Sequence, residues 1–220
     1  MEKEKRQIIV LSQFLFDEKM LNDGINDSNV EELPDMAFIS IIGTPQVLSD
    51  YLKEENTVHW FKENHPNVLN LEFDDVDHDL RFANCEFKAI TPSQSEEIVK
   101  FIEANLGKDF IIHCRAGMSR SQAVGCFLYD FYKEYFSESQ PYLLRDFANK
   151  GVTRELKRVL FQKLKIGYMK WLGDKLEVKC PYCGKEFTFT SKEITYGFLY
   201  PESIKCKFCD NFMELKDEVK

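Results

Sequence analysis

Three things are missing from this sequence: a long apolar run, an excess of positive charge and an even number of cysteines. A transmembrane helix needs about 18 consecutive apolar residues, and no stretch of the chain supplies them. The 29 basic and 37 acidic residues give a net charge of −8, which excludes nucleic-acid binding through overall positive charge. A secreted disulfide framework pairs its thiols, so seven cysteines favour metal binding and thiol chemistry in a reducing compartment.

The first residues also lack the marks of a secretory leader. The apolar residues of 8–16 are followed by Asp17-Glu18-Lys19 instead of a small-residue cleavage site. We therefore interpret residues 7–11 as a first β-strand and expect a cytoplasmic protein. Hydrophobic residues make up 44% of the chain and charged residues 30%, which is typical of a globular fold and not of a disordered one.

Short apolar runs alternate with segments of helical periodicity over most of the chain. This alternation is typical of an α/β fold with a largely parallel central sheet flanked by helices. The predicted strands cover residues 7–11, 36–42, 68–73 and 110–114.

Three helices are predicted around the strand 110–114, one before it in the sequence and two after it. Residues 91–94 read Thr-Pro-Ser-Gln, a capping box with proline at the first helical position, and Gly107 ends that helix. Apolar residues recur at the helical period between 124 and 135, which predicts a second helix with one buried face. A third helical segment is predicted from about residue 152 to about residue 170.

The composition changes after about Lys175, and we predict two domains, 1–172 and 173–220. The second contains two C-x-x-C pairs whose inner cysteines are separated by 22 residues. Such pairs suit one tetrahedral Zn²⁺ held by four thiolates, with no open position for catalysis, so we predict structural zinc. Two redox dithiols would need thioredoxin-like surroundings, which are absent. The predicted ligands are Cys180, Cys183, Cys206 and Cys209.

The tail resembles a zinc ribbon, with Gly184 supplying the tight turn after the first pair. Residues 176–220 carry seven lysines and eight acidic residues, so their charge disfavours nucleic-acid binding. Residues 151–175 are instead basic, which indicates either a solvated helix face or a docking surface for an acidic, phosphorylated partner.

Residues 110–121 form the segment that points most directly to chemistry. They are expected to run from a strand through a small-residue loop into a helix, an arrangement whose backbone N–H groups suit a phosphate. Gly117 lets the backbone turn closely around an oxyanion, and Arg120 offers a planar fork to two phosphate oxygens. Cys114 lies at the strand end, next to these backbone N–H groups and the positive end of the helix. Such an environment lowers the pKa of a thiol and favours a thiolate nucleophile.

The pattern His113-Cys114-(five residues)-Arg120-Ser121 resembles the signature of the cysteine-dependent protein tyrosine and dual-specificity phosphatases, especially their small single-domain members. The resemblance extends over about residues 7–140. It implies that Cys114 is the nucleophile, that Arg120 clamps phosphate and that Ser121 hydrogen-bonds the sulfur. It further implies that His113 orders the loop. The implied phosphate cradle consists of the backbone amides of Arg115, Ala116, Gly117, Met118, Ser119 and Arg120.

The same family uses an aspartate as general acid, on a loop after an earlier strand. Four aspartates follow the predicted strand 68–73, and Asp75, 39 positions before Cys114, is favoured by its place relative to Phe73. The other three stay open as alternatives, in the order Asp77, Asp74 and Asp79.

We therefore expect an α/β phosphomonoester hydrolase that acts on phosphorylated proteins through a phosphocysteine intermediate and without a catalytic metal. Two alternatives stay open: an RNA 5′-phosphatase of the same chemistry, and an inactive phosphate-binding module recruited through the ribbon. Cys85 and Cys126 are expected in the core, although either could form a reversible disulfide with Cys114. Neither a membrane nor a defined oligomer is implied.

Overall fold

The computed structural model describes residues 5–52, 58–82, 84–137, 143–162, 166–172, 175–190, 203–209 and 212–217. The chain divides into two compact units, Met1–Lys157 and Arg158–Lys220, which we call the first and the second unit. This division lies upstream of the predicted boundary at residues 172 and 173. Within the described ranges, no helix combines the length and the apolar character needed to cross a membrane.

A four-stranded parallel sheet forms the centre of the first unit, which confirms the predicted α/β class with a parallel sheet flanked by helices. Each predicted strand matches an observed one to within one residue at either end. Because all four strands are parallel, their carboxyl ends meet at one edge, where open α/β sheets bind ligands. The order across the sheet is β1 (Ile8–Ser12), β6 (Asp109–Cys114), β2 (Met36–Ile42) and β3 (Val68–Glu72).

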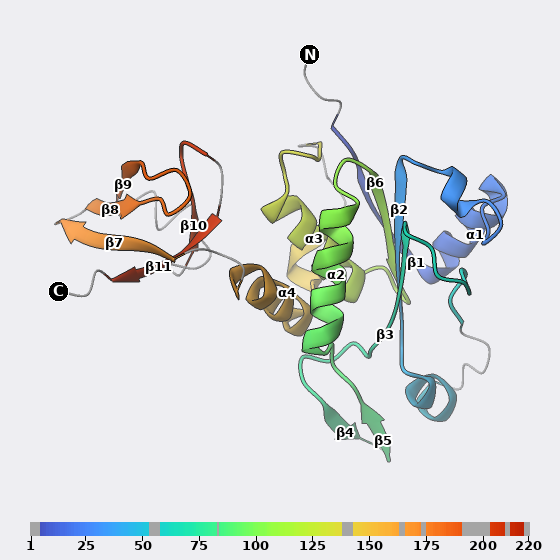
Figure 1. Ribbon diagram of the computed structural model, residues 1–220. Helices are drawn as coiled ribbons and strands as arrows, with labels where there is room; N and C mark the ends of the chain where they lie inside the picture. The colour runs from blue at the N-terminus through green and yellow to red at the C-terminus, as the bar shows by residue number, and fades with distance from the viewer. Residues whose placement is uncertain are drawn as a thin grey trace. The chain divides into compact units, whose positions relative to one another are not determined.

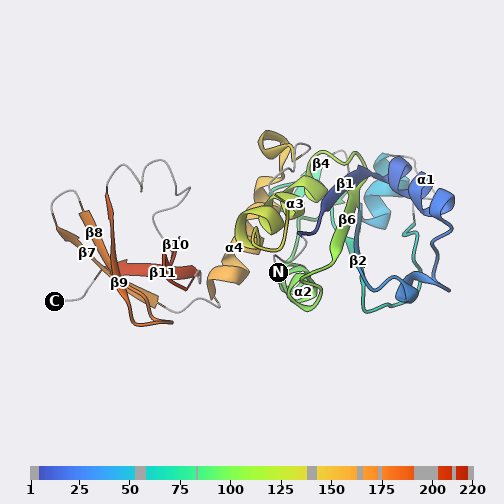
Figure 2. The same ribbon diagram turned by 90° about the horizontal axis from the view of Figure 1, so that it is seen from above.

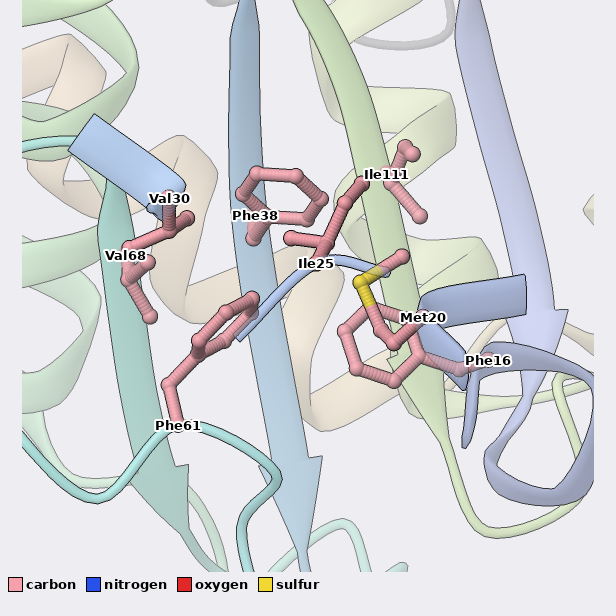
Figure 3. Packing of buried hydrophobic residues seen from close by; sticks show 8 residues of the cluster. All are labelled: Phe16, Met20, Ile25, Val30, Phe38, Phe61, Val68 and Ile111. Atoms are coloured by element: carbon pink, nitrogen blue, oxygen red, sulfur yellow. The ribbon is translucent and has the colours of Figure 1, made fainter. Parts of the chain in front are cut away.

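Helices cover both faces of this sheet, as Figures 1 and 2 show. Helix α1 (Gln13–Asp23) lies on one face, whereas α2 (Pro92–Ala104) and α3 (Arg120–Phe131) lie on the other. The capping box predicted at the start of α2 is present. Beneath α1, Phe16 and Met20 pack with Phe38 of β2 and Ile111 of β6, and all four side chains are buried (Figure 3).

Shorter elements complete the first unit. Strands β4 (Leu80–Phe82) and β5 (Cys85–Phe87) form an antiparallel pair, and Asn84 between them has a positive φ. The remaining elements are η1 (Val30–Glu32), η2 (Val47–Tyr51) and η3 (Arg145–Phe147). The helix α4 (Lys150–Gln162) begins in the first unit and extends past its last residue, Lys157.

The helix predicted from about residue 152 to about residue 170 is correct only in its first part. α4 ends at Gln162, and β7 (Ile166–Leu172) pairs antiparallel with β8 (Lys175–Lys179) and parallel with β11 (Phe212–Asp217). Pairing with a strand more than 40 residues away is invisible to local periodicity, and it decides the structure of this β-rich segment. The basic residues of 151–175 therefore do not share one helix face: Lys170 and Lys175 lie on strands, and Lys163 and Lys165 fall outside the described residues.

The second unit is built on a five-stranded sheet, in the order β10 (Ser203–Lys205), β11, β7, β8 and β9 (Glu186–Thr190). Strands β8 and β9 alternate strictly between exposed and buried residues, so one face of the pair is apolar. Among the described residues of this unit, one buried cluster contains Leu176, Val178, Cys180, Phe187, Phe189, Cys206 and Met213.

Candidate functional site

The loop between β6 and α3 rests on the end of β1. Gly117, within this loop, has φ +71°, and a Cβ there would lie 2.6 Å from the backbone carbon of Leu11 and the backbone nitrogen of Ser12. The backbone N–H of Gln13 also donates to the carbonyl of Arg115 (3.2 Å). Only glycine therefore fits at position 117, and the loop is fixed against the first strand.

Cys114 ends β6 and is 2% exposed. Its Sγ lies 3.0 Å from the Oγ of Ser121, the contact that the resemblance implies. Burial by itself raises the pKa of a thiol, but the hydrogen bonds from Ser121 and the charge of Arg120 outweigh it. The pKa of Cys114 therefore lies below its ordinary value of 9.0. A lowered pKa gives a larger thiolate fraction at neutral pH, and the thiolate is the nucleophilic form.

Arg120 begins α3 and is a buried cation, with 5% of the residue exposed. Its Nη1 donates to the carbonyl oxygen of Phe73 at 2.6 Å, which ties it to the end of β3. Within the described part of the chain, its Nε has no hydrogen-bond partner and no carboxylate forms an ion pair with it. A buried cation without a counter-charge is costly, so the site is electrostatically suited to an anion.

His113 is held beneath the loop by two contacts. Its ring stacks on Phe16 with the centroids 4.1 Å apart, and its Nε2 lies 2.7 Å from the Oγ of Ser40. The same Oγ lies 2.6 Å from the Nδ1 of His59. Burial, with smaller effects from His59 and Arg120, lowers the pKa of His113 to about 3, so the ring is neutral at pH 7 and a poor general base.

Three of the four candidate aspartates are occupied by backbone contacts away from the loop. Asp74 is buried and accepts hydrogen bonds from the N–H and hydroxyl of Thr44 (both 2.9 Å) and the N–H of Lys88 (2.8 Å). Asp77 accepts from the N–H of Gly151 (3.1 Å). Asp79 accepts from the N–H of Ala89 (2.9 Å) and contacts the ammonium of Lys88.

Asp75 alone among the four contacts the loop. Its Oδ1 accepts hydrogen bonds from the hydroxyl of Ser119 (2.7 Å) and from the side-chain nitrogen of Asn149 (2.7 Å). Since Ser119 directly precedes Arg120, this carboxylate lies next to the predicted phosphate cradle. The candidate that the sequence favours therefore contacts the loop between Cys114 and Arg120 through Ser119.

The structure brings the predicted loop residues together with four that the sequence did not indicate. Gln122 donates from Nε2 to the carbonyl of Gly117 (3.0 Å) and accepts from the N–H of Leu144 (2.9 Å), so it supports the loop from α3. Ser40 and His59 support His113, and Asn149 supports Asp75. No motif marks these residues, because most of them are far in sequence from the groups they contact. In the loop itself, Arg115, Ala116 and Met118 are exposed, whereas Gly117 is buried.

The two cysteines expected in the core are both buried there, Cys85 on β5 and Cys126 on α3. Burial raises the pKa of the Cys126 thiol, the reverse of the shift at Cys114. Neither forms a disulfide among the described residues.

The four predicted metal ligands form one cluster in the second unit. Their sulfurs all lie within 4.8 Å of one another, with 3.7 Å between Cys180 and Cys209 and 3.8 Å between Cys183 and Cys206. Four sulfurs at the Zn–S distance of about 2.3 Å around a tetrahedral ion lie about 3.8 Å apart. The cluster can therefore hold a metal ion such as zinc.

The two C-x-x-C turns also resemble each other in their hydrogen bonds. The N–H of Tyr182 donates to the Sγ of Cys180, and the N–H of Phe208 donates to the Sγ of Cys206, each at 3.4 Å. Gly184, at which a tight turn was expected after the first pair, has a positive φ of +72°. Backbone donors of this kind stabilise thiolates, which is the form that binds a metal.

No protein-family model matches the chain, and no curated protein matches it either. The arrangement itself joins a thiol of lowered pKa, a buried cation that forms no ion pair with a described carboxylate, and a carboxylate with one oxygen held against the loop. Together these groups can bind an oxyanion, attack its central atom and exchange a proton with the departing or incoming oxygen.

Proposed function

We propose that the first unit is a cysteine-dependent phosphatase of the protein tyrosine and dual-specificity type, acting on phosphotyrosine and secondarily on phosphoserine and phosphothreonine in proteins. The observation that carries this proposal is the buried guanidinium of Arg120, whose Nε has no partner among the described residues, beside a thiol of lowered pKa. A phosphate dianion supplies the missing acceptor and counter-charge. The resemblance of residues 113–121 to the phosphatase signature supports the same conclusion.

In the first step, the thiolate of Cys114 attacks the phosphorus of the bound phosphomonoester. An S–P bond forms while the bond from phosphorus to the ester oxygen breaks, and Asp75 gives its proton to that leaving oxygen. The guanidinium of Arg120 and the loop amides stabilise the charge on the remaining phosphoryl oxygens. The products are an alcohol or phenol and a phosphocysteine.

In the second step, water attacks the phosphorus of the phosphocysteine. The Asp75 carboxylate takes a proton from this water, the S–P bond breaks, and inorganic phosphate leaves with the site restored. The Ser121 hydroxyl, 3.0 Å from the sulfur, stabilises the departing thiolate. The neutral ring of His113 holds the loop and exchanges no proton with the substrate.

The four cysteines of the second unit suit Zn²⁺, and we assign them a structural role. The sulfur spacing fits a tetrahedral ion, and four thiolates leave no coordination position open to water. Zinc would therefore stabilise the second unit and take no part in the phosphate chemistry.

The test compares Cys114→Ser with Cys126→Ser on a phosphotyrosine peptide. Cys114→Ser should abolish turnover but keep phosphate affinity, because a serine hydroxyl stays protonated at neutral pH while the anion site remains. Cys126→Ser removes a buried thiol of α3 and should keep turnover. Turnover by Cys114→Ser would overturn the proposal.

Parallel assays on a phosphoserine peptide and on 5′-triphosphorylated RNA separate the substrate classes. Activity on RNA alone would show that the protein is an RNA 5′-phosphatase and not a protein phosphatase.

A further inference from the structure

Both hydrogen bonds to the carboxylate of Asp75 end on the same oxygen. The Ser119 hydroxyl and the Asn149 amide nitrogen each donate to Oδ1 at 2.7 Å, and Oδ2 accepts no hydrogen bond from any described residue. A carboxylate held in this way keeps one oxygen fixed and the other available. The available oxygen is the one that can carry a proton.

Asn149 uses both ends of its side-chain amide. Its oxygen accepts from the backbone N–H of Val152 (2.9 Å), which caps the start of α4, so its nitrogen is directed to Asp75. Its own backbone N–H donates to the carbonyl of Ser119 (3.2 Å). The residue is buried, with 6% exposed. One side chain therefore joins the start of α4, the loop before Arg120 and the candidate acid.

The first turn of α4 holds the rest of the acidic segment as well. The N–H of Gly151 donates to Asp77 Oδ1 (3.1 Å), and Nη2 of Arg154 donates to the Asp77 carbonyl (3.0 Å). A Cβ at position 151 would lie 2.8 Å from the Cα of Asp77, so this close approach requires glycine. The segment that carries Asp75 is thus packed directly on α4.

We propose that Asn149 is a positioning residue for proton transfer: it fixes Oδ1 of Asp75 so that the protonated Oδ2 faces the leaving oxygen. This proposal rests on the proposed function, because it takes Asp75 as the proton donor. In the first step the proton moves from Oδ2 to the leaving oxygen as the P–O bond breaks. In the second step the same oxygen takes the proton of the attacking water. Asn149 touches neither the substrate nor the sulfur.

Asn149→Ser is the decisive variant, because serine keeps the helix cap but lacks the amide donor. The measurement is kcat/KM on two substrates, an alkyl phosphate with a poor leaving group and an activated aryl phosphate that departs almost without a proton. General acid catalysis contributes about 10²–10⁴-fold, so its partial loss should cost about 10-fold on the alkyl phosphate and less than about 2-fold on the aryl phosphate. Thr153→Ala, which alters the same turn without contact to Asp75, should leave the ratio of the two rates unchanged.

A second variant tests the position of Asp75 without changing its hydrogen-bond donors. Gly151→Ala adds a good helix former to α4 but places its Cβ against the backbone of Asp77, so it should displace the acidic segment without unfolding the helix. It should lower the alkyl phosphate rate more than the aryl phosphate rate, as Asn149→Ser does. In the double variant Asp75→Asn/Asn149→Ser, the loss should not exceed that of Asp75→Asn alone, because the two residues act through one proton.

The outcomes separate this proposal from the proposed function. If Asp75→Asn shows the loss that depends on the leaving group but Asn149→Ser loses equally on both substrates, or not at all, the positioning role is overturned and the phosphatase stands. Additive losses in the double variant overturn it as well. If Asp75→Asn shows no such dependence, the acid assignment fails and the positioning role fails with it. If Cys114→Ser retains turnover, the proposed function itself is wrong.

Discussion

The two units of this chain are stabilised by different means. Under α1 the first unit buries a cluster of eight apolar side chains, including Phe16, Phe38 and Phe61, and further core residues lie across the sheet. Among the described residues of the second unit, one cluster buries seven residues, and two of these are cysteines of the candidate metal site. A unit of this length usually needs a staple such as a metal ion. We therefore expect the unit that carries the proposed chemistry to fold without metal, and metal dependence to belong to the other unit.

Metal removal should have the largest effect and should divide the two units most clearly. Structural zinc contributes apparent free energies of about 10–16 kcal/mol at pH 7, so Cys206→Ser or a strong chelator should unfold the second unit. The first unit should keep its secondary structure and its activity. Elemental analysis gives the zinc content per chain, circular dichroism follows the secondary structure, and a turnover assay follows the activity. A chain without stoichiometric metal, or a first unit that unfolds together with the second, would contradict the comparison.

Phe38→Ala should produce the converse result. The side chain is fully buried on β2, and truncation of a buried phenylalanine costs about 3–5 kcal/mol of the free energy of unfolding. Urea unfolding followed by circular dichroism should show this loss in the first unit, whereas the metal content of the second unit should not change. Loss of metal in this variant would show that the units are not independent.

Two neighbouring aspartates should separate stability from catalysis within the first unit. Asp74→Asn weakens three hydrogen bonds to a buried carboxylate and should cost about 1.5–3 kcal/mol of stability. Asp75→Asn should instead lower turnover of an alkyl phosphate by about 10²–10⁴-fold, with little change in stability. Thermal unfolding and kcat/KM on both variants check the pair. If Asp74→Asn gave the loss that depends on the leaving group, the acid would be misassigned by one residue.

The smallest expected effect is the change of stability with pH, which has opposite signs in the two units. His65 contacts Glu31 (2.8 Å) and Asp27 (3.0 Å), and chiefly the hydrogen bond to Glu31 raises its pKa above 6.5. This contribution to stability is complete below the unfolded pKa and is lost as pH rises through the raised folded pKa. In the second unit protons compete with the metal for thiolates, so stability falls as pH decreases. Urea unfolding at pH 6 and pH 8.5 should show a pH-dependent loss in the first unit that is absent in His65→Gln. An unchanged slope in the variant would exclude His65 as its source.

The parts of the fold that the sequence predicted depend on contacts close in the chain. The strand before Cys114, the loop containing Gly117 and the cap at Thr91 all follow from residues within a few positions of one another. The predicted extent of the helix from about residue 152 was wrong, because residues 166–172 form β7, which pairs with β8 and with the distant β11.

The candidate site shows the same distinction. Cys114, Arg120 and Ser121 were predicted because they share one segment, and Asp75 was favoured among four neighbouring aspartates. The choice among them depends on Ser119 and Asn149, which lie 44 and 74 residues from Asp75 in the sequence. Hydrogen bonds over such separations leave no local periodicity or spacing to recognise, so Asn149 and Ser40 were not predicted.

The contact of Gly117 with the end of β1 has a consequence for the order in which the molecule is made. During synthesis β1 emerges early, but its partner β6 follows about a hundred residues later, as the 102-residue separation of the hydrogen-bonded Gln7 and Asp109 shows. Contacts between residues so far apart in the sequence form slowly, because a long loop must close first. While β6 is still inside the exit tunnel, a ribosome-bound chain thus carries β1 unpaired, and the contact between Gly117 and β1 has not formed. The proposed phosphate affinity should therefore appear only after β6, the loop and the start of α3 have left the tunnel.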